Sequence, residues 1–429
     1  MYISVKEAME QEGKEVDLRG WCYRERKSNK FVFMVLRDHS DIIQCVVNKD
    51  KVDEKTWNEA NKIMIEASLK LSGIVRKDER APTGYEVDVK SLEISGQGGV
   101  FPITKDQSQE FLLDVRHLWL RSRKLTAVMK IRSTVFEAVD EFFRNRGFYE
   151  AAPPIFTPNA CEGGATLFKV KYFDDTVYLT QSWQLYAEAM IASLEKIYCN
   201  SPCFRAEKSK TSRHLAEFYM AEMEMAWAGL DDVMRHAEEL VSFIIRKVLE
   251  KNKQELEILK RAVSKLENIR APFPRITYTE ALKILDEKEG MKIKWGKDLR
   301  TIEEDLLMKH FNSPVMVTHY PKEIMAFYKP KDPNNPETAL CFDMLAPEGY
   351  GEIIGGSQRE TDIEELKKSL KKQGEKTENY EWYLDTRRHG SVPHAGFGMG
   401  VERMVAWLCG LDNIKDAIPF PRTMLRKSP

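Results

Sequence analysis

The first 97 residues alternate between hydrophobic and polar positions. Val16 and Leu18 flank one polar residue, as in a strand with one buried face. The β-rich runs FVFMVLRD (31–38) and DIIQCVV (41–47) are separated by two residues, which predicts a hairpin. A polar helical stretch follows at 50–66, before more alternating residues. Four or five strands with one helix fit a small β-barrel, although a generic small β-domain fits the pattern as well.

A change of pattern separates this part from the rest of the chain. The GQGG run at 96–99 favours a boundary, and we expect residues 98–113 to form a linker. Beyond it, hydrophobic residues recur at the period of one helix face, which predicts a long amphipathic helix over 123–146. The residues on this face are Val128, Ile131, Val135, Val139 and Phe142.

The remainder, residues 114–429, mixes the strand and helix periods. PVMVTHY (314–320) and KEIMAFY (322–328) predict strands, and GVERMVAWLCG (400–410) predicts a helix. Residues 230–271 are strongly charged and helical, and we expect a solvated helical insertion near 250–272. Because no regular βαβ repeat occurs, the chain is predicted to be an α+β protein.

Composition narrows the class of protein. The 429 residues suggest two or three domains, and 42% hydrophobic residues can bury a sizeable core. The chain has no run of roughly 18 apolar residues and its N-terminus lacks a signal-peptide core, so we expect a cytoplasmic protein without a membrane partner. The 66 basic and 67 acidic residues nearly cancel, so RNA binding needs local basic patches and DNA binding is not expected. Seven scattered cysteines without a CxxC pair favour free thiols.

The segment SPCFRAEKSKTSRHLAEFYMAEMEMAW (201–227) carries charges inside an otherwise apolar pattern. Arg205 and Glu207 are two residues apart and share one side of a strand, as do Glu222 and Glu224. Between these pairs lies a basic loop with Lys208, Lys210, Arg213 and His214. Buried charges are costly unless each has a partner. The segment therefore predicts either an internal Arg–Glu ion pair or a site for a polyanion.

Two further segments carry glycines and charges. In CFDMLAPEGYGEIIGGSQRE (341–360), Asp343, Glu348 and Glu352 accompany Arg359, a combination that suits Mg²⁺ shared with substrate phosphates but also suits an acidic turn. In SVPHAGFGMGVERMVAW (391–407), glycines precede a helix that carries Arg403. This pattern lacks the context of a dinucleotide site and the GK[ST] of a P-loop.

Together the three segments resemble the signature motifs of class II aminoacyl-tRNA synthetases. The long helix ending in AAPPIFTP (151–158) resembles the dimer-forming motif 1, FRAE-loop-RHLAEF resembles motif 2, and GFGMGVER resembles motif 3. The segments RHLWLR, CEGGATLF and QSWQLYAE resemble the aspartyl/asparaginyl subgroup. The resemblance covers nearly the whole chain. It implies an OB-fold anticodon-binding barrel over 1–97 and a catalytic domain over 114–429, built on an antiparallel sheet flanked by helices.

The resemblance also implies an ATP site. Adenine would lie between Phe218 and Arg403, with Glu207 near its amino group. Arg205 would bind the α-phosphate, and Arg213 or His214 the γ-phosphate. Asp343 and Glu352 would hold Mg²⁺, although their separation is longer than is usual in the family. The amino acid carboxylate attacks the α-phosphorus, pyrophosphate leaves, and the 3′-hydroxyl of the tRNA then displaces AMP. Arg205, Arg403 and Mg²⁺ supply charge neutralisation, and no protein nucleophile is needed.

The amino-acid specificity depends on a few positions. The aspartyl pattern QSPQLYK has a lysine where this chain has Ala187, and an aspartate where it has Glu222. A neutral carboxamide would offer its oxygen to Arg359 and its NH₂ to Glu222. The carboxylate of an aspartate would instead face Glu222 in a pocket with one cation fewer than the aspartyl pattern provides. Glu162 and Gln184 would bind the α-amino group, with Ser182 nearby. A loop at Gly163 and Gly164 would close over the substrate.

On these residues the chain is similar to asparaginyl-tRNA synthetases, and L-asparagine, ATP and tRNA(Asn) are the expected substrates. Three alternatives remain open. One is a non-discriminating aspartyl-tRNA synthetase that also charges tRNA(Asn), with Ala187 compensated by Lys169 or Lys171. Another is an ammonia-dependent asparagine synthetase on the same core, although such relatives lack the barrel. The last is a catalytically silent RNA-binding paralogue.

The N-terminal barrel is expected to read the anticodon. Phe33 and Gln44 fit the family positions for stacking on the middle base and for hydrogen bonding to it. Arg24 and Arg26 belong to a basic cluster that would follow the phosphates. The family further implies a homodimer, with motif 1 and Pro153 at the interface.

Overall fold

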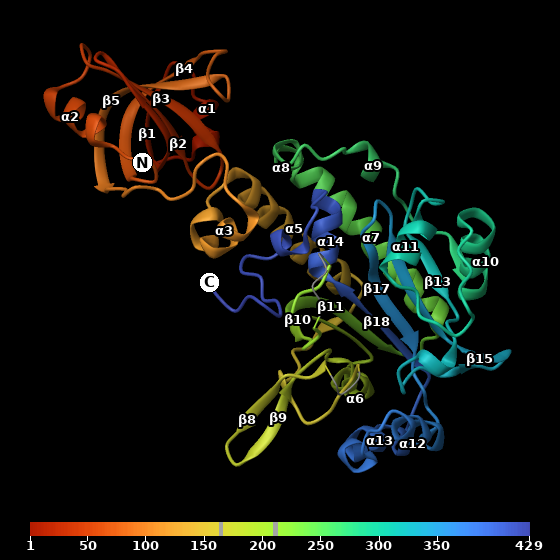
Figure 1. Ribbon diagram of the computed structural model, residues 1–429. Coiled ribbons are helices and arrows are strands. Elements are labelled where there is room, and N and C mark those ends of the chain that lie inside the picture. Colours follow the sequence, from red (N-terminus) through yellow and green to blue (C-terminus); the bar gives the residue numbers. More distant parts are fainter. Residues whose placement is uncertain (163–165, 209–212) are drawn as a thin grey trace. The chain divides into compact units, whose positions relative to one another are not determined.

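The protein is described here by a computed structural model, which covers residues 1–162, 166–208 and 213–429 (Figure 1). The chain divides into two compact units, residues 1–112 and 113–429. Within the described residues, no helix combines the length and the apolar character that crossing a bilayer requires.

The N-terminal unit is a closed five-stranded barrel with the strand order β1-β2-β3-β5-β4. Its strands and helices are α1 (Val5–Met9), β1 (Glu15–Lys27), β2 (Phe31–Arg37), β3 (Ile42–Asn48), α2 (Glu54–Lys62), β4 (Ser68–Lys77) and β5 (Tyr85–Gly96). The expected hairpin is confirmed, because β2 and β3 pair antiparallel. Alternate side chains such as Val32, Met34 and Leu36 fill the barrel interior, and this burial explains the alternating sequence pattern.

The second unit is built on an eight-stranded sheet with the order β12-β13-β16-β17-β18-β11-β10-β6. All neighbouring pairs are antiparallel except β12–β13 and β10–β6. The strands are β6 (Tyr149–Glu150), β10 (Lys196–Phe204), β11 (Glu217–Ala226), β12 (Arg275–Thr277), β13 (Val315–Thr318), β16 (Cys341–Ala346), β17 (Gly351–Gln358) and β18 (His394–Gly400). The predicted α+β class and antiparallel sheet are therefore confirmed.

Three helices cover one face of this sheet: α5 (Arg123–Arg144), α7 (Leu230–Lys251) and α14 (Val401–Cys409) (Figure 1). The amphipathic helix predicted at 123–146 is α5, which begins after Ser122, whose hydroxyl accepts the Leu125 N–H. Its predicted apolar face is buried in the main core together with side chains of α7 and α14. The opposite face of the sheet is left for the functional site.

The remaining elements surround the sheet. The helices are α3 (Gln109–Asp114), α4 (Arg116–Trp119), α6 (Gln184–Leu194), α8 (Lys253–Ile258), α9 (Ser264–Glu267), α10 (Tyr278–Glu289), α11 (Thr301–Met308), α12 (Ile363–Lys372) and α13 (Glu381–Arg388). Short 3₁₀ turns lie at Lys322–Ile324, Thr377–Tyr380 and Ile414–Ala417. The strands β7 (Phe156–Thr157), β8 (Lys169–Tyr172) and β9 (Asp175–Leu179) form a small sheet, and β14 (Lys331–Asp332) pairs with β15 (Asn335–Ala339).

Two sequence predictions are wrong. KEIMAFY is not a strand: a 3₁₀ turn occupies Lys322–Ile324, and the consecutive residues Phe327 and Tyr328 are both buried against the α12–α13 region. A half-buried strand would bury only alternate residues. The segment near 250–272 is also not a simply solvated insertion. Leu256, Leu266 and Ile269 are buried in the main core, so this segment is part of the packed domain.

Candidate functional site

The site lies on the sheet face that the core helices leave uncovered, and the strand period explains its composition. On β11, Ala221 and Met223 enter the core, while Glu222 and Glu224 face the other way into a cavity. Opposite them on β18, Gly398 pairs with Glu222 and Gly396 pairs with Glu224. A β-carbon at Gly396 would lie 2.1 Å from Glu224 Oε2, so only glycine leaves room for this carboxylate.

A cavity of about 210 Å³ on this face gathers the predicted amino-acid-binding and metal-binding residues. Its lining includes Glu162, Ser182, Gln184, Glu222, Arg359, Asp343 and Glu352. These residues come from segments far apart in the sequence. Gly163 and Gly164, where we expect a closing loop, lie outside the described residues.

Glu222 is held by the segment that precedes α6. The Ser182 hydroxyl donates to Glu222 Oε1, and the Trp183 backbone N–H donates to Oε2 at 3.2 Å. Burial raises the pKa of Glu222 to about 7, although these two hydrogen bonds oppose the shift. Ser182 therefore acts here as a donor to Glu222.

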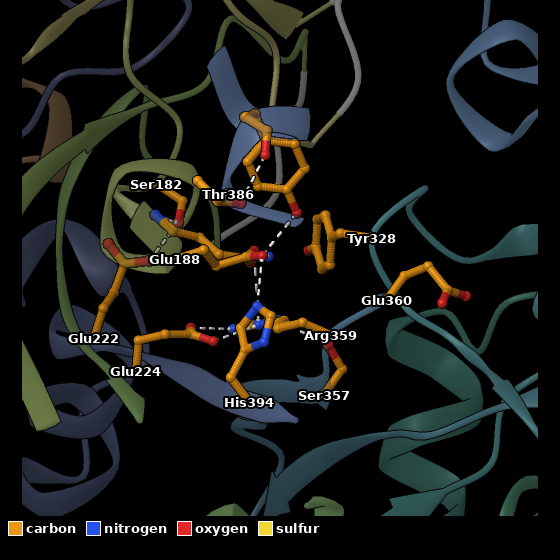
Figure 2. A network of polar contacts seen from close by, with 12 residues as sticks. Ser182, Glu188, Glu222, Glu224, Tyr328, Ser357, Arg359, Glu360, Thr386 and His394 are labelled. Carbon is orange, nitrogen blue, oxygen red and sulfur yellow. Dashed lines mark hydrogen bonds and ion pairs between the residues drawn. The ribbon is translucent and has the colours of Figure 1, made fainter. Parts of the chain in front are cut away.

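Arg359 pairs with an acid of strand β11, Glu224. Its Nε and Nη2 donate to the two oxygens of Glu224 at 2.9 and 2.7 Å, and its Nη1 donates to Ser357 at 2.8 Å (Figure 2). Of the acids in its own segment, Glu348 accepts instead from Arg261 at 2.6 Å and from Lys265 at 2.8 Å. Glu224 of the segment 201–227 thus pairs with Arg359, which lies outside that segment, so this ion pair is not the internal one that the sequence suggested.

Glu162 and Gln184 lie at another part of the same cavity. The Tyr328 hydroxyl donates to Glu162 Oε1 at 2.6 Å. Burial opposes ionisation of Glu162, but the positive charges of Arg205 and Lys329 outweigh it and lower its pKa. The Gln184 amide donates from Nε2 to Glu188 at 2.9 Å.

The specificity position Ala187 does not line the cavity. It is fully buried in an apolar cluster with Trp183 and Ile191. Lys169 and Lys171, which could have compensated for its missing charge, are exposed on β8 and do not line the cavity either. A different lysine, Lys329, does so.

Asp343 and Glu352 fit a divalent cation. A bulge between Met344 and Leu345 shifts the β16–β17 pairing, and both carboxylates border the space beside Gly355. A β-carbon on Gly355 would lie 3.0 Å from Glu352 Oε1 and 3.5 Å from Asp343 Oδ1. Burial and the nearby Glu352 raise the pKa of Asp343 well above its ordinary value. A cation between the two groups would relieve this repulsion, and hard oxygen ligands suit Mg²⁺.

A second pocket adjoins the first and contains all the predicted ATP-binding residues. They are Arg205, Glu207, Arg213, His214, Phe218, Glu352 and Arg403. Arg205 and Glu352 line both pockets, so they lie at the border where groups bound in the two pockets would react with each other. The Arg205 guanidinium lies 5.5 Å from the centre of the Phe218 ring, and its buried Nε has no hydrogen-bond partner among the residues that the structure describes. A buried donor of this kind is suited to a phosphate oxygen.

The other cations of this pocket are paired with protein acids. Arg403 Nη1 donates to the Glu352 carbonyl oxygen at 2.6 Å and to its Oε2 at 3.1 Å. Arg213 donates to Asp305 at 2.6 Å. Burial and the neighbouring Arg403 lower the pKa of His214, which favours a neutral ring.

The predicted anticodon residues share the outer face of the barrel. Arg26 pairs with Phe33 across β1–β2, and Val35, two residues further, pairs with both Arg24 and Gln44. Gln44 Nε2 donates to Glu86 at 2.9 Å. The face therefore presents an aromatic ring and an oriented amide beside two exposed arginines.

Sequence reasoning missed several residues of the site. Glu188 is completely buried beside the cavity, and it follows Gln184 by one helical turn, a spacing that could have identified it. Tyr328 and Lys329 gave no such signal, because the surrounding pattern predicted a strand. His394 donates from Nδ1 to the Val392 carbonyl oxygen at 2.7 Å, and its Nε2 lies 3.1 Å from Glu188 Oε2, so these two contacts orient the ring.

Comparison with known proteins adds independent findings. The family described as tRNA synthetases class II (D, K and N) matches residues 108–424, and the OB-fold nucleic acid binding domain matches residues 16–95. The chain is 52% identical to an asparagine–tRNA ligase of Thermococcus kodakarensis, over 98% of this chain and 97% of that protein. It superposes on the asparaginyl-tRNA synthetase of Pyrococcus horikoshii complexed with asparaginyl-adenylate with a TM-score of 0.96 and 48% identity, covering 100% of both chains. The corresponding Entamoeba histolytica complex gives a TM-score of 0.91 at 32% identity, again over 100% of both chains.

Proposed function

The chain belongs to the class II tRNA synthetases, in their asparagine–tRNA ligase branch, and from this membership we propose how its residues attach asparagine to tRNA(Asn). The enzyme first forms asparaginyl-adenylate from asparagine and ATP, and then transfers the asparaginyl group to the tRNA. The roles of individual residues below are part of the proposal.

Asparagine binds in the cavity with its α-ammonium group against Glu162 and the amide oxygen of Gln184. Its side-chain carbonyl accepts from Arg359, and its NH₂ group donates to Glu222. The ammonium and carboxamide groups of the substrate then each meet a complementary protein group, as a desolvated site requires.

ATP binds in the adjoining pocket. Adenine stacks between Phe218 and the Arg403 guanidinium, with Glu207 near its amino group. Arg205, whose Nε has no partner in the described part of the chain, donates to the α-phosphate at the border of the two pockets. Arg213 or His214 contacts the γ-phosphate.

In the first step, a carboxylate oxygen of asparagine attacks the α-phosphorus while the bond to pyrophosphate breaks. Arg205 and Arg403 stabilise the charge that develops on the phosphoryl oxygens. Asp343 and Glu352 would hold Mg²⁺, which supplies further neutralisation of the phosphates when bound. In the second step, the 3′-terminal hydroxyl of the tRNA attacks the asparaginyl carbonyl and AMP leaves.

The observation that best supports asparagine over aspartate is the pairing of the two acids on β11. Arg359 already binds Glu224 with two hydrogen bonds, and Glu222 lies on the same face, where no described arginine pairs with it. A substrate carboxylate would therefore face an acid in the cavity, whereas a carboxamide can donate to it. Unpaired buried charges of this kind can discriminate by roughly 10⁴-fold or more.

The partners beyond the active site follow from the other surfaces. The outer face of the barrel, with Phe33, Gln44, Arg24 and Arg26, binds the anticodon. Exposed apolar side chains near motif 1 support a homodimer: Ile155, Phe156, Tyr172 and Phe173. We further propose that the enzyme works in the cytoplasm and does not bind DNA.

ATP–pyrophosphate exchange with asparagine and aspartate, measured in parallel with Mg²⁺, tests this function. Strong exchange with asparagine and negligible exchange with aspartate is expected. Exchange with both amino acids would instead indicate a non-discriminating aspartyl-tRNA synthetase. Aspartate-dependent AMP formation that needs ammonia but no tRNA would indicate an asparagine synthetase.

A further inference from the structure

Glu188 is a buried carboxylate behind the amino-acid cavity, and the mechanism above gives it no role. Its side chain is 0% exposed. Its Oε1 accepts the Gln184 amide at 2.9 Å and lies 4.0 Å from Arg359 Nε. Figure 2 shows Glu188 at the centre of the polar network. One carboxylate thus contacts the two residues that we expect to hold opposite ends of asparagine.

The other oxygen of Glu188 is fixed from the opposite side. Oε2 accepts from Tyr383 at 2.8 Å and from Arg387, and it lies 3.1 Å from His394 Nε2. Arg387 also donates to the Glu360 backbone carbonyl at 3.1 Å. Burial alone would raise the pKa of Glu188, but Arg387 and His394 outweigh it and lower the pKa, so the group is ionised. The carboxylate is therefore both charged and held in one orientation.

This contact decides how the Gln184 amide is used. A glutamine side chain has one donor group and one acceptor oxygen. Because its NH₂ group donates to Glu188, the oxygen is the part left for a ligand. An α-ammonium group is a donor only, so it needs this oxygen.

The same carboxylate affects Arg359. Glu224 already forms two hydrogen bonds with the guanidinium, and Glu188 adds a second negative charge at 4.0 Å. Two acids thus offset the charge of Arg359, while some of its five N–H groups remain available. A guanidinium in this state suits a neutral carbonyl oxygen better than a carboxylate.

We propose that Glu188 is a positioning residue for asparagine, which directs the Gln184 amide oxygen toward the α-ammonium group and makes Arg359 selective for a carboxamide. This inference rests on the proposed function, because it assumes that asparagine occupies the cavity.

Two variants separate this role from simple structural support. Glu188→Gln and Arg387→Gln break the same buried ion pair, but only the former changes the group that touches Gln184 and Arg359. Glu188→Gln is expected to raise KM for asparagine about tenfold, the scale of one lost hydrogen bond to a charged group. It should leave KM for ATP nearly unchanged and increase the ratio of aspartate to asparagine exchange. Arg387→Gln should lower the melting temperature while keeping KM for asparagine close to that of the wild type.

The double variant E188Q/R387Q covers the case in which the single variant does not fold. Removing both charges together leaves no unpaired buried ion, so folding is expected to survive. Its KM for asparagine should rise as in E188Q. A wild-type KM and wild-type rejection of aspartate in E188Q or the double variant would overturn the proposal, as would equal KM increases in E188Q and R387Q. If the wild type itself shows no asparagine-dependent exchange, the proposed function fails instead.

Discussion

Glu222 and Glu224 lie two residues apart on one strand and face the same cavity, yet only Glu224 is paired with a guanidinium. Glu222 is held by the Ser182 hydroxyl and one backbone N–H. Two acids of the same type thus have different electrostatic surroundings: Glu224 is the partner of Arg359, and Glu222 is the one that we propose accepts from the substrate.

Asparagine use should depend on the ionisation of Glu222. Its pKa is raised to about 7, and the charged carboxylate accepts from the substrate NH₂ group more strongly than the protonated acid does. At saturating ATP, kcat/KM for asparagine in pyrophosphate exchange is therefore expected to rise with pH up to and just above pH 7. Glu222→Gln should lower kcat/KM by about 10- to 100-fold, as expected for a charge-assisted hydrogen bond, and should remove this rise.

Glu304→Gln is a matched control for this pH effect. Burial and Glu352 also raise the pKa of Glu304 to about 7, but this residue does not line the amino-acid cavity. The control variant should keep the pH-dependent rise. If the rise survives in Glu222→Gln and disappears in Glu304→Gln, a different group controls asparagine binding.

The raised pKa of Glu222 also predicts that the stability difference between the wild type and Glu222→Gln changes with pH. The folded state raises the pKa of Glu222 above its ordinary value of 4.5, so the folded state holds the proton more tightly than the unfolded chain. The free energy of unfolding of the wild type therefore decreases, through this group, as the pH rises from about 4.5 to about 7. The melting temperature of Glu222→Gln relative to the wild type should accordingly be higher at pH 8 than at pH 5, and an unchanged difference would contradict the assignment.

Arg403→Ala should abolish adenylate formation. The substitution removes both the guanidinium that we propose stacks on adenine and its contact with Glu352, so pyrophosphate exchange should fall by about 10³-fold or more. Arg403→Lys keeps the charge but loses the planar group, and we expect it to recover little activity. Near-normal exchange in Arg403→Ala would remove this residue from the ATP site.

Phe33→Ala should weaken tRNA charging while sparing adenylate formation. Stacking on a base contributes about 1–3 kcal/mol, which corresponds to a rise in KM for tRNA of about 5- to 100-fold. Trp295→Ala, which removes a partly exposed aromatic residue of the other unit, serves as a control and should leave KM for tRNA unchanged. Equal losses in charging and in exchange for Phe33→Ala would contradict the division of labour between the units.

Removal of divalent cations should stop adenylate formation, and Mg²⁺ should restore it. Asp343→Asn keeps the size of the side chain but removes one charge from the pair beside Gly355. This variant should need a several-fold higher Mg²⁺ concentration for half-maximal exchange. An unchanged requirement for Mg²⁺ would leave Asp343 outside the metal site.

The expected dimer can be tested on the apolar cluster near motif 1. The Phe156 and Tyr172 rings lie 5.9 Å apart, and Phe173, which is 80% exposed, lies 4.9 Å from Tyr172. In light scattering, the double variant F156S/F173S should shift a dimer toward monomers, because it removes apolar area from an interface. Leu425→Ser, another highly exposed apolar position, should not change the mass.

The sequence predicts the fold where one pattern dominates. The barrel hairpin and helix α5 follow from clear periods of two and 3.6 residues, and both are confirmed. The strand predicted for KEIMAFY is wrong because tertiary packing buries the adjacent residues Phe327 and Tyr328, which a local period cannot anticipate. The prediction of a solvated insertion near 250–272 fails because a few apolar residues are enough to anchor a charged segment to the core.

Motifs predict which residues belong to the site better than they predict which of its charged residues pair with each other. Arg359 and Glu224 are separated by 135 residues, and no local pattern indicates that they meet in preference to Arg359 and the acids of its own segment. Strand order decides this choice, because only β18 separates β11, which carries Glu224, from β17, which ends just before Arg359.

The charge balance of the cavity links the stability of the enzyme to the supply of its substrates. Its lining contains the acids Glu162, Glu222, Glu224, Asp343 and Glu352 against the cations Arg205, Lys329 and Arg359. Repulsion among crowded carboxylates opposes folding, while a substrate ammonium group or a metal ion relieves it by binding only the native state. A cell that runs short of asparagine and ATP would thus hold this enzyme in its least heat-resistant and most protease-sensitive form, so that starvation would lower the amount of enzyme as well as its turnover.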